Sequence, residues 1–158
     1  MTSADSEQYM RNRILEACEE AMLLKQAFFR DNADLIAKAA ETIATAFNDG
    51  NRLFIFGNGG SAADSQHIAA EFVNRYKMER PSLPAMALST DTSIITSISN
   101  DYAFKYVFSK QIQAFGQAGD VAWAISTSGT SINILEALKA ARHLGLTTMA
   151  LTGRGGGQ

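Results

Sequence analysis

The chain has 158 residues, of which 46% are hydrophobic and 19% are charged, and its formal net charge is −2. This size and composition predict one folded domain and exclude an intrinsically disordered chain. The near balance of 14 basic and 16 acidic residues excludes the basic surface typical of proteins that bind nucleic acid or an anionic membrane directly.

Two helices are predicted before the first strand, at residues 5–29 and from Asp31 or Asn32 to Gly50. Apolar residues recur about every 3.6 positions in both segments. They are Ile14, Cys18, Ala21, Met22, Leu24 and Ala27 in the first helix, and Leu35, Ala39, Ile43 and Phe47 in the second. Asp31 or Asn32 can cap the second helix, and Gly50 can end it. Because a minimal βαβ unit does not need these helices, we expect their apolar faces to pack against a partner subunit.

From residue 51 onward the pattern changes to strands that alternate with helices. Short apolar runs predict strands at residues 52–56, 85–89, 121–125 and 147–151, and helices at 62–75, 90–99, 106–115 and 132–144. Such alternation predicts a three-layer α/β fold, a parallel sheet with helices on both faces, and leaves the strand order open. The glycine-rich ending at 153–157 leaves the fourth strand uncovered, so we expect the natural domain to continue beyond residue 158.

Three features predict a cytoplasmic protein without a membrane anchor. The first eight residues are polar and acidic, unlike a signal peptide. No apolar run approaches the length of a membrane span. Cys18 is the single cysteine of the sequence, so neither an internal disulfide nor a cysteine-ligated metal cluster is expected.

Two polar, glycine-containing loops each follow a predicted strand and open a predicted helix. The first, at 57–61, reads Gly-Asn-Gly-Gly-Ser, and the second, at 126–131, reads Ser-Thr-Ser-Gly-Thr-Ser. Ligands bind beyond the carboxyl ends of parallel strands, and a helix N-terminus favours an anion. We therefore predict a bound phosphate, held by Ser61, Ser126, Thr127, Ser128 and Ser131. Helix capping alone would explain one such loop, but two on one sheet favour phosphate.

The two loops also indicate the size of the ligand. The first lacks the G-x-G-x-x-G spacing of dinucleotide-binding proteins, and no Lys-Ser/Thr pair closes it as in a P-loop. A small phosphate ester is therefore favoured over a nucleotide.

His67 and Glu71 lie four residues apart on the helix that follows the first loop. This spacing places an imidazole and a carboxylate on one face, where both could bind a divalent metal such as zinc. The alternative is an ordinary surface hydrogen bond, and a zinc site needs more ligands than these two. The other histidine, His143, is expected to interact with the C-terminal dipole of its helix.

Polar residues elsewhere have simpler interpretations. Asn100 and Asp101 are expected in a loop just before a helix, as an N-cap or as acceptors for sugar hydroxyls. Arg75, Lys77 and Arg80 are expected to form a solvated surface.

The chain contains, in order, a strand, the G-N-G-G-S loop, a helix with H-x-x-x-E, a further strand, the S-T-S-G-x-S loop and a helix. This order of elements and motifs resembles the sugar isomerase (SIS) domain family. The resemblance covers nearly the whole chain, including Asp91-Thr-Ser, Asn100-Asp101 and Leu151-Thr-Gly. It implies a flavodoxin-like fold and a homotetramer whose active sites lie at subunit interfaces, partly built by the N-terminal helices. It also implies one zinc per subunit and conversion of sedoheptulose 7-phosphate to a glycero-manno-heptose 7-phosphate, the entry to heptose for bacterial lipopolysaccharide.

The resemblance also implies roles for individual residues. His67 and Glu71 match metal ligands, and Glu71 also matches the catalytic base of an enediol mechanism. The substrate-binding positions are Asn58, Gly59, Gly60, Ser61, Glu71, Asn100, Asp101, Ser126, Thr127, Ser128 and Ser131. The family supplies a further Gln and His to the zinc site, and nothing in this chain matches them.

A second function fits the same fold. Some SIS proteins are non-catalytic sugar-phosphate sensors or tetrameric adaptors that bind the bacterial replication initiator. The adaptors lack the glutamate of the H-x-x-x-E pair, so Glu71 favours the enzyme.

Overall fold

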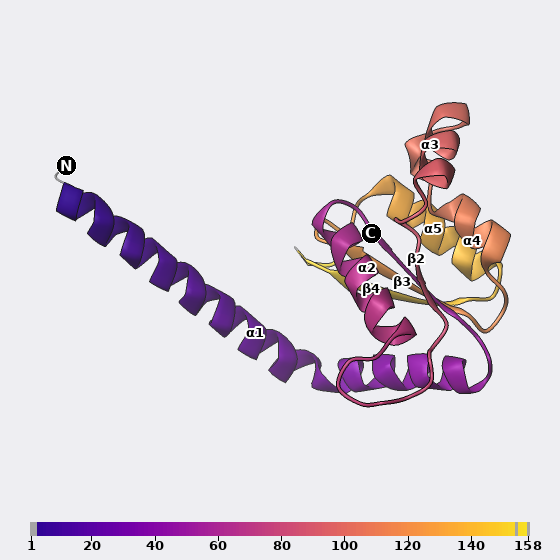
Figure 1. The fold of residues 1–158 in the computed structure, drawn as a ribbon, viewed down its shortest axis with the longest axis horizontal. Helices are drawn as coiled ribbons and strands as arrows, with labels where there is room; N and C mark the ends of the chain where they lie inside the picture. Colours follow the sequence, from indigo (N-terminus) through magenta and orange to yellow (C-terminus); the bar gives the residue numbers. More distant parts are fainter. Residues whose placement is uncertain (1–2, 154, 158) are drawn as a thin grey trace. The chain divides into compact units, whose positions relative to one another are not determined.

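The computed structural model describes residues 3–153 and 155–157 (Figure 1). The chain divides into two compact units, which meet between Ala40 and Glu41. Its elements are, in order, α1 (Ser3–Asn48), β1 (Leu53–Gly57), α2 (Gly60–Val73), β2 (Ala85–Ala87), α3 (Thr92–Asp101), a short 3₁₀ helix η1 (Phe104–Tyr106), α4 (Ser109–Phe115), β3 (Val121–Ser126), α5 (Ile132–His143) and β4 (Thr147–Thr152).

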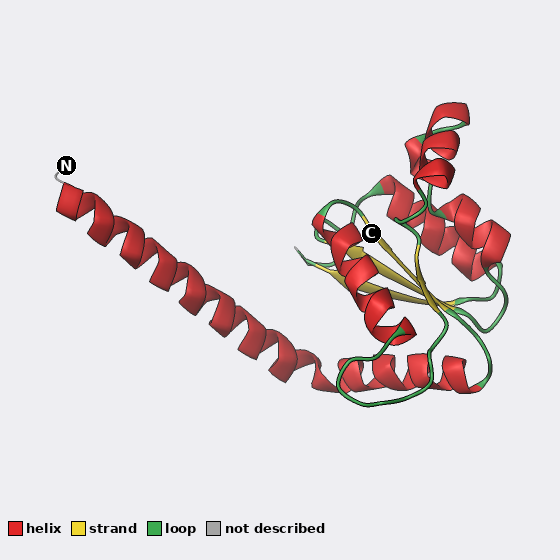
Figure 2. Ribbon diagram, in the orientation of Figure 1, coloured by secondary structure: helices red, strands yellow, loops and turns green. Residues whose placement is uncertain are grey.

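The second unit is built on a four-stranded parallel sheet in the order β2-β1-β3-β4 (Figure 2). The predicted alternation of strands and helices is therefore confirmed. The chain leaves β1 toward one edge of the sheet and returns through β3 on the other side of β1. Ligands bind at such a reversal point in open α/β sheets, beyond the carboxyl ends of the two central strands.

The sheet is covered on both faces because the side chains of its central strands alternate between two apolar clusters. One cluster, with residues from α4 and α5, includes Phe54, Phe56, Ile112, Ala137 and Ala141. The other, with residues from the end of α1 and from α2, includes Ile43, Ala46, Leu53, Ile55 and Ala69. The apolar residues of β1 are buried on both sides, as the uninterrupted apolar run predicts. The three-layer fold is confirmed.

The two predicted N-terminal helices are one helix, α1, and the predicted break at residues 30–31 is wrong. No glycine or proline occurs between Ser3 and Asn48, so nothing in this stretch forces the helix to end. The Asn32 side chain, expected as an N-cap, instead donates to the Phe28 carbonyl one turn earlier. The predicted end is confirmed, because Gly50 has a positive φ of 80°.

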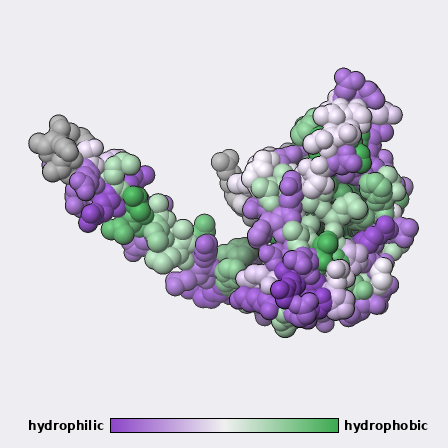
Figure 3. Space-filling model, viewed as in Figure 1, coloured by the Kyte–Doolittle hydropathy of each residue, from purple (hydrophilic) through white to green (hydrophobic). Residues whose placement is uncertain are grey.

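The first unit consists of α1 residues that expose many apolar side chains, and Figure 3 shows hydrophobic residues among polar ones along this helix. These exposed residues include Tyr9, Met10, Ile14, Leu15, Met22, Leu23, Leu24, Phe29 and Leu35. In the described part of the chain, no helix has an apolar stretch that could cross a membrane.

A buried carboxylate joins the amino ends of β1 and β3. Asp120 is 1% exposed, and its two carboxylate oxygens accept from the backbone N–H groups of Arg52 and Gln117, each at 2.8 Å. The Arg52 guanidinium lies 3.3 Å from the same carboxylate. Charge-assisted bonds to backbone N–H groups are stronger than neutral ones, so Asp120 fixes the start of both strands.

We expect Asp120→Asn to lower the free energy of unfolding by about 1–3 kcal/mol. The amide oxygen can still accept from one N–H group, but the amide nitrogen would face the other, so two donors would oppose each other. Urea unfolding monitored by circular dichroism measures the change. Asp49→Asn, at an exposed position, is the matched control and should change stability little. Equal stability of the two variants would contradict this role for Asp120.

Candidate functional site

The two polar loops lie side by side at the carboxyl edge of the sheet. They follow β1 and β3, which pair directly, with Gly57 opposite Ile125. An added Cβ at Gly57 would lie 2.6 Å from the Ser61 Cβ and 2.8 Å from the Ile125 carbonyl oxygen. Only glycine permits this close approach of the first loop to β3. The structure thus brings together the two loops that the sequence analysis predicted to share a ligand.

The first loop turns sharply into α2. Gly59, which precedes the helix, has φ 57° and ψ −122°, a conformation that favours glycine. The Ser61 N–H group donates to the Asn58 carbonyl at 3.0 Å, which closes the turn. The Asn58 side chain points toward α5 and exchanges two hydrogen bonds with Asn133, at 2.9 and 2.8 Å. Asn133 was missed in the sequence analysis, because no local motif marks a partner 75 positions away.

The second loop is held in shape by its own serines. The buried Ser126 hydroxyl accepts from the Gly129 N–H group at 3.1 Å, and the Ser128 hydroxyl accepts from the Thr130 N–H group at 3.2 Å. A hydroxyl that accepts a hydrogen bond can still donate its own proton. Both serines can therefore hold the loop and donate to an anion at the same time.

Ser131 stands at the N-terminus of α5. Within the described residues, its side chain makes no capping hydrogen bond. The Ile134 and Leu135 N–H groups donate to the Ser131 carbonyl. The backbone N–H groups of the residues before Ile134, at the start of α5, are those that a helix N-terminus offers to an anion. An uncommitted hydroxyl at this position supports the predicted phosphate site.

The glycine-rich segment after β4 lies against the second loop. An added Cβ at Gly153 would be 2.8 Å from the Thr127 carbonyl oxygen, and one at Gly129 would be 2.4 Å from the Gly156 carbonyl oxygen. The glycines at residues 155–157 all have positive φ. Close backbone packing therefore requires glycine at residues 153 and 157, and a positive φ favours glycine at 155 and 156.

His67 and Glu71 lie one helical turn apart on α2, as predicted. His67 Nε2 is 3.8 Å from Glu71 Oε1, and the two side chains are 78% and 35% exposed. Imidazole and carboxylate are zinc ligands, but a zinc site takes three or four protein ligands. Among the described residues, no group of three or more His, Cys, Asp or Glu side chains could hold a metal ion. These two residues alone do not make a zinc site.

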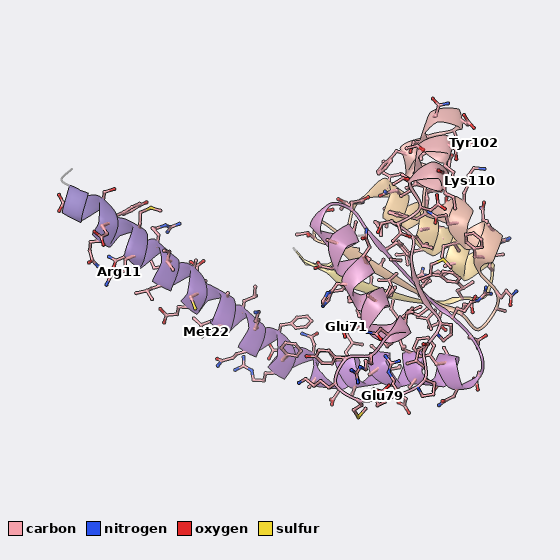
Figure 4. The ribbon with its side chains drawn as sticks, viewed as in Figure 1. Arg11, Met22, Glu71, Glu79, Tyr102 and Lys110 are labelled. Atoms are coloured by element: carbon pink, nitrogen blue, oxygen red, sulfur yellow. The ribbon has the colours of Figure 1, made fainter. Side chains whose placement is uncertain are left out.

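The His67–Glu71 pair lies away from the two loops of the same chain. Glu71 follows Ser61 by ten residues, which corresponds to a rise of about 15 Å along α2. The neighbouring Phe72 carbonyl accepts from the Leu83 N–H group just before β2 starts, so this end of α2 is at the amino edge of the sheet. Figure 4 shows Glu71 toward the C-terminal end of α2. One copy of the described chain does not bring Glu71 to its own second loop, where the phosphate is predicted to bind.

Arg80 was expected on a solvated surface, and this prediction is wrong. Its guanidinium donates to the carbonyl oxygens of Glu71 and Phe72, at 2.7 and 2.8 Å, and so caps the C-terminal end of α2. Arg75 agrees with the surface prediction, since it is exposed and pairs with Glu79. Side-chain charge alone did not distinguish the two arginines.

Asn100 and Asp101 are the last two residues of α3, so the predicted loop before a helix is wrong. They are exposed, and the Asn100 side-chain amide donates to the Asp101 carboxylate at 2.8 Å. The helix is capped at its other end by Asp91, which accepts from the Ile94 N–H group. His143 is the last residue of α5 and is exposed, as expected for a cation at a helix C-terminus.

Comparisons with known proteins agree with these features. The family model for the SIS domain matches residues 18–153. A phosphoheptose isomerase from Nitratidesulfovibrio vulgaris is 54% identical over 94% of this chain and 71% of its own length. One from Aquifex aeolicus is 51% identical over 94% of this chain and 78% of its own length. A solved phosphoheptose isomerase structure from Neisseria gonorrhoeae is 44% identical and superposes with a TM-score of 0.88, over 94% of this chain and 77% of that one.

Proposed function

We propose that this chain, which belongs to the SIS domain family, is an aldose–ketose isomerase that converts sedoheptulose 7-phosphate to D-glycero-D-manno-heptose 7-phosphate. The observation that carries the proposal is that the chain contains both an S-T-S-G-x-S loop at the carboxyl edge of the sheet and a helix, α2, with His67 and Glu71. Relatives that are 54% and 51% identical to this chain over 94% of its length are named phosphoheptose isomerases.

The second loop and the N-terminus of α5 would hold the phosphate of the substrate. Ser126, Thr127, Ser128 and Ser131 supply hydroxyl and backbone donors there, and Asn58, Gly59, Gly60 and Ser61 come from the adjacent loop. Holding the phosphate fixes the far end of the sugar, so that binding energy at this end orients the reacting carbons. Asn100 and Asp101 are proposed to bind sugar hydroxyls.

Glu71 would move the proton that the isomerisation requires. The ketose carries its carbonyl at C2, and the carboxylate takes a proton from C1 to give an enediol. Return of that proton to C2, with a hydroxyl proton passing from one oxygen to the other, leaves the carbonyl at C1. Atoms and electrons balance without an oxidant or reductant.

We propose that two copies of the chain build each site, within the homotetramer that the family resemblance implies. The phosphate lies on C7 and the reacting carbons are C1 and C2, and the rise of about 15 Å along α2 exceeds the reach of such a sugar. A second copy can bring its Glu71 to the phosphate loop of the first. The apolar side chains exposed on α1 supply surface for such contacts, since burying them is favourable.

Zinc is part of the proposal through His67 and Glu71, which would supply two of its ligands. A bound zinc ion would act as a Lewis acid on the sugar carbonyl. Because two ligands do not complete a zinc site, the proton transfer above is assigned to Glu71 and no step in it is assigned to the metal. We also propose that the reaction takes place in the cytoplasm.

Proton exchange measured by NMR tests the proposal. The protein is incubated with sedoheptulose 7-phosphate and zinc in D₂O, and we expect deuterium at C1 of the ketose and C2 of the aldose. Exchange that a chelator stops would show that metal participates, and exchange that survives the chelator would overturn the zinc proposal. Binding of the sugar phosphate without exchange would instead support the second function, a non-catalytic sugar-phosphate adaptor or sensor.

A further inference from the structure

We propose that Asn133, through its paired amide with Asn58, is a positioning residue that sets the spacing between the two loops of the site. The inference rests on the proposed function. Asn133 belongs to the first turn of α5, directly after the phosphate loop, and Asn58 belongs to the loop that opens α2. The two residues are 75 positions apart in sequence.

The pair uses both polar atoms of each amide. Asn58 Nδ2 donates to Asn133 Oδ1 at 2.9 Å, and Asn133 Nδ2 donates to Asn58 Oδ1 at 2.8 Å. The two bonds form a closed ring, which fixes distance and orientation together, as a single bond would not. Asn133 is 5% exposed, so water competes poorly for its amide. A shift of either loop would break both bonds at once.

The position of the pair gives it a role beyond stability. Loop-internal bonds already shape the phosphate loop, since Gly129 donates to Ser126 and Thr130 donates to Ser128. The Asn58–Asn133 pair adds no bond within the phosphate loop. It connects the first turn of α5, directly after that loop, to the loop that opens α2. Loss of the pair should therefore leave each loop intact and change the distance between them. A small change in this distance matters for a substrate that contacts both loops.

Asn133→Leu tests this role, since leucine has a similar volume and removes both hydrogen bonds. We expect the affinity for sedoheptulose 7-phosphate and kcat/KM each to fall at least about tenfold. Because the phosphate loop keeps its own bonds, the affinity for inorganic phosphate should change less than about twofold. Titration by NMR gives both affinities, and steady-state kinetics gives kcat/KM.

Gln111→Leu is the matched control for lost stability. Gln111 is also buried, and its side-chain amide also makes two hydrogen bonds, to the Leu88 and Val107 carbonyls. Both variants should unfold at lower temperature than the parent protein. The control should retain its affinity for both ligands.

Three results separate the interpretations. In thermal unfolding, a double variant, Asn58→Leu with Asn133→Leu, should lose no more stability than Asn133→Leu alone if the two amides act as a unit. Equal losses of phosphate and sugar-phosphate affinity, or unchanged sugar-phosphate affinity, would overturn the positioning role. A parent protein that binds sedoheptulose 7-phosphate without isomerising it would overturn the proposed function, while the two affinities would still decide the role of Asn133.

Discussion

Replacing Glu71 by glutamine is expected to lower kcat by about 10²–10⁴-fold, the usual contribution of a positioned acid or base. Glutamine keeps the size and polarity of the side chain but cannot take a proton from C1. The Glu71 side chain is partly exposed, and its only described ion pair is the 3.8 Å contact with His67, so its loss should cost little stability. Incorporation of deuterium from D₂O measures the chemical step directly.

Glu79→Gln is the matched control for this experiment. Glu79 is 82% exposed and pairs with Arg75 a few residues beyond α2, so the same substitution there should leave turnover unchanged. The Glu71→Gln variant should still bind the sugar phosphate, because the phosphate loop is untouched. If that variant kept normal exchange, Glu71 would not be the base. If it lost folding and binding together, its role would be structural.

The sequence predicted the strands well because their apolar runs leave few alternatives. The run at the first strand predicted a strand buried on both faces, and β1 is buried and pairs with both β2 and β3. Helix ends were predicted less well where the signal was a single polar residue. Asp31 and Asn32 are acceptable caps, yet neither stops α1, because a cap stabilises a helix end without preventing the helix from continuing.

The contacts that build the site could not be read from local patterns. The strand order brings the two loops together, but periodicity says nothing about which parallel strands are neighbours. From its charge alone, Arg80 is predicted to lie on the solvated surface. In the fold its guanidinium instead donates to the Glu71 carbonyl oxygen. The Asn58–Asn133 pair likewise depends on the pairing of β1 with β3. Motifs predicted which residues bind the substrate or catalyse its reaction, and the tertiary structure determines which of these residues lie close together.

Ser131→Asp is expected to raise KM for the sugar phosphate by about 10²-fold or more, since like charges placed together cost several kcal/mol. The carboxylate would lie at the N-terminus of α5, where the proposed phosphate binds. Aspartate is also a preferred N-cap, and its charge complements the helix dipole. The fold should therefore be as stable as before, or more so. Steady-state kinetics and thermal unfolding measure the two effects separately.

Ser131→Asn separates charge from size in this prediction. Asparagine is also a good N-cap and has nearly the shape of aspartate, but it is neutral. We expect it to raise KM only a few-fold, through the loss of one hydroxyl donor. Equal KM values for the Asp and Asn variants would mean that the phosphate binds elsewhere. A large difference, with both proteins folded, would locate a negative charge of the substrate at the N-terminus of α5, because charge is the main property that distinguishes the two side chains.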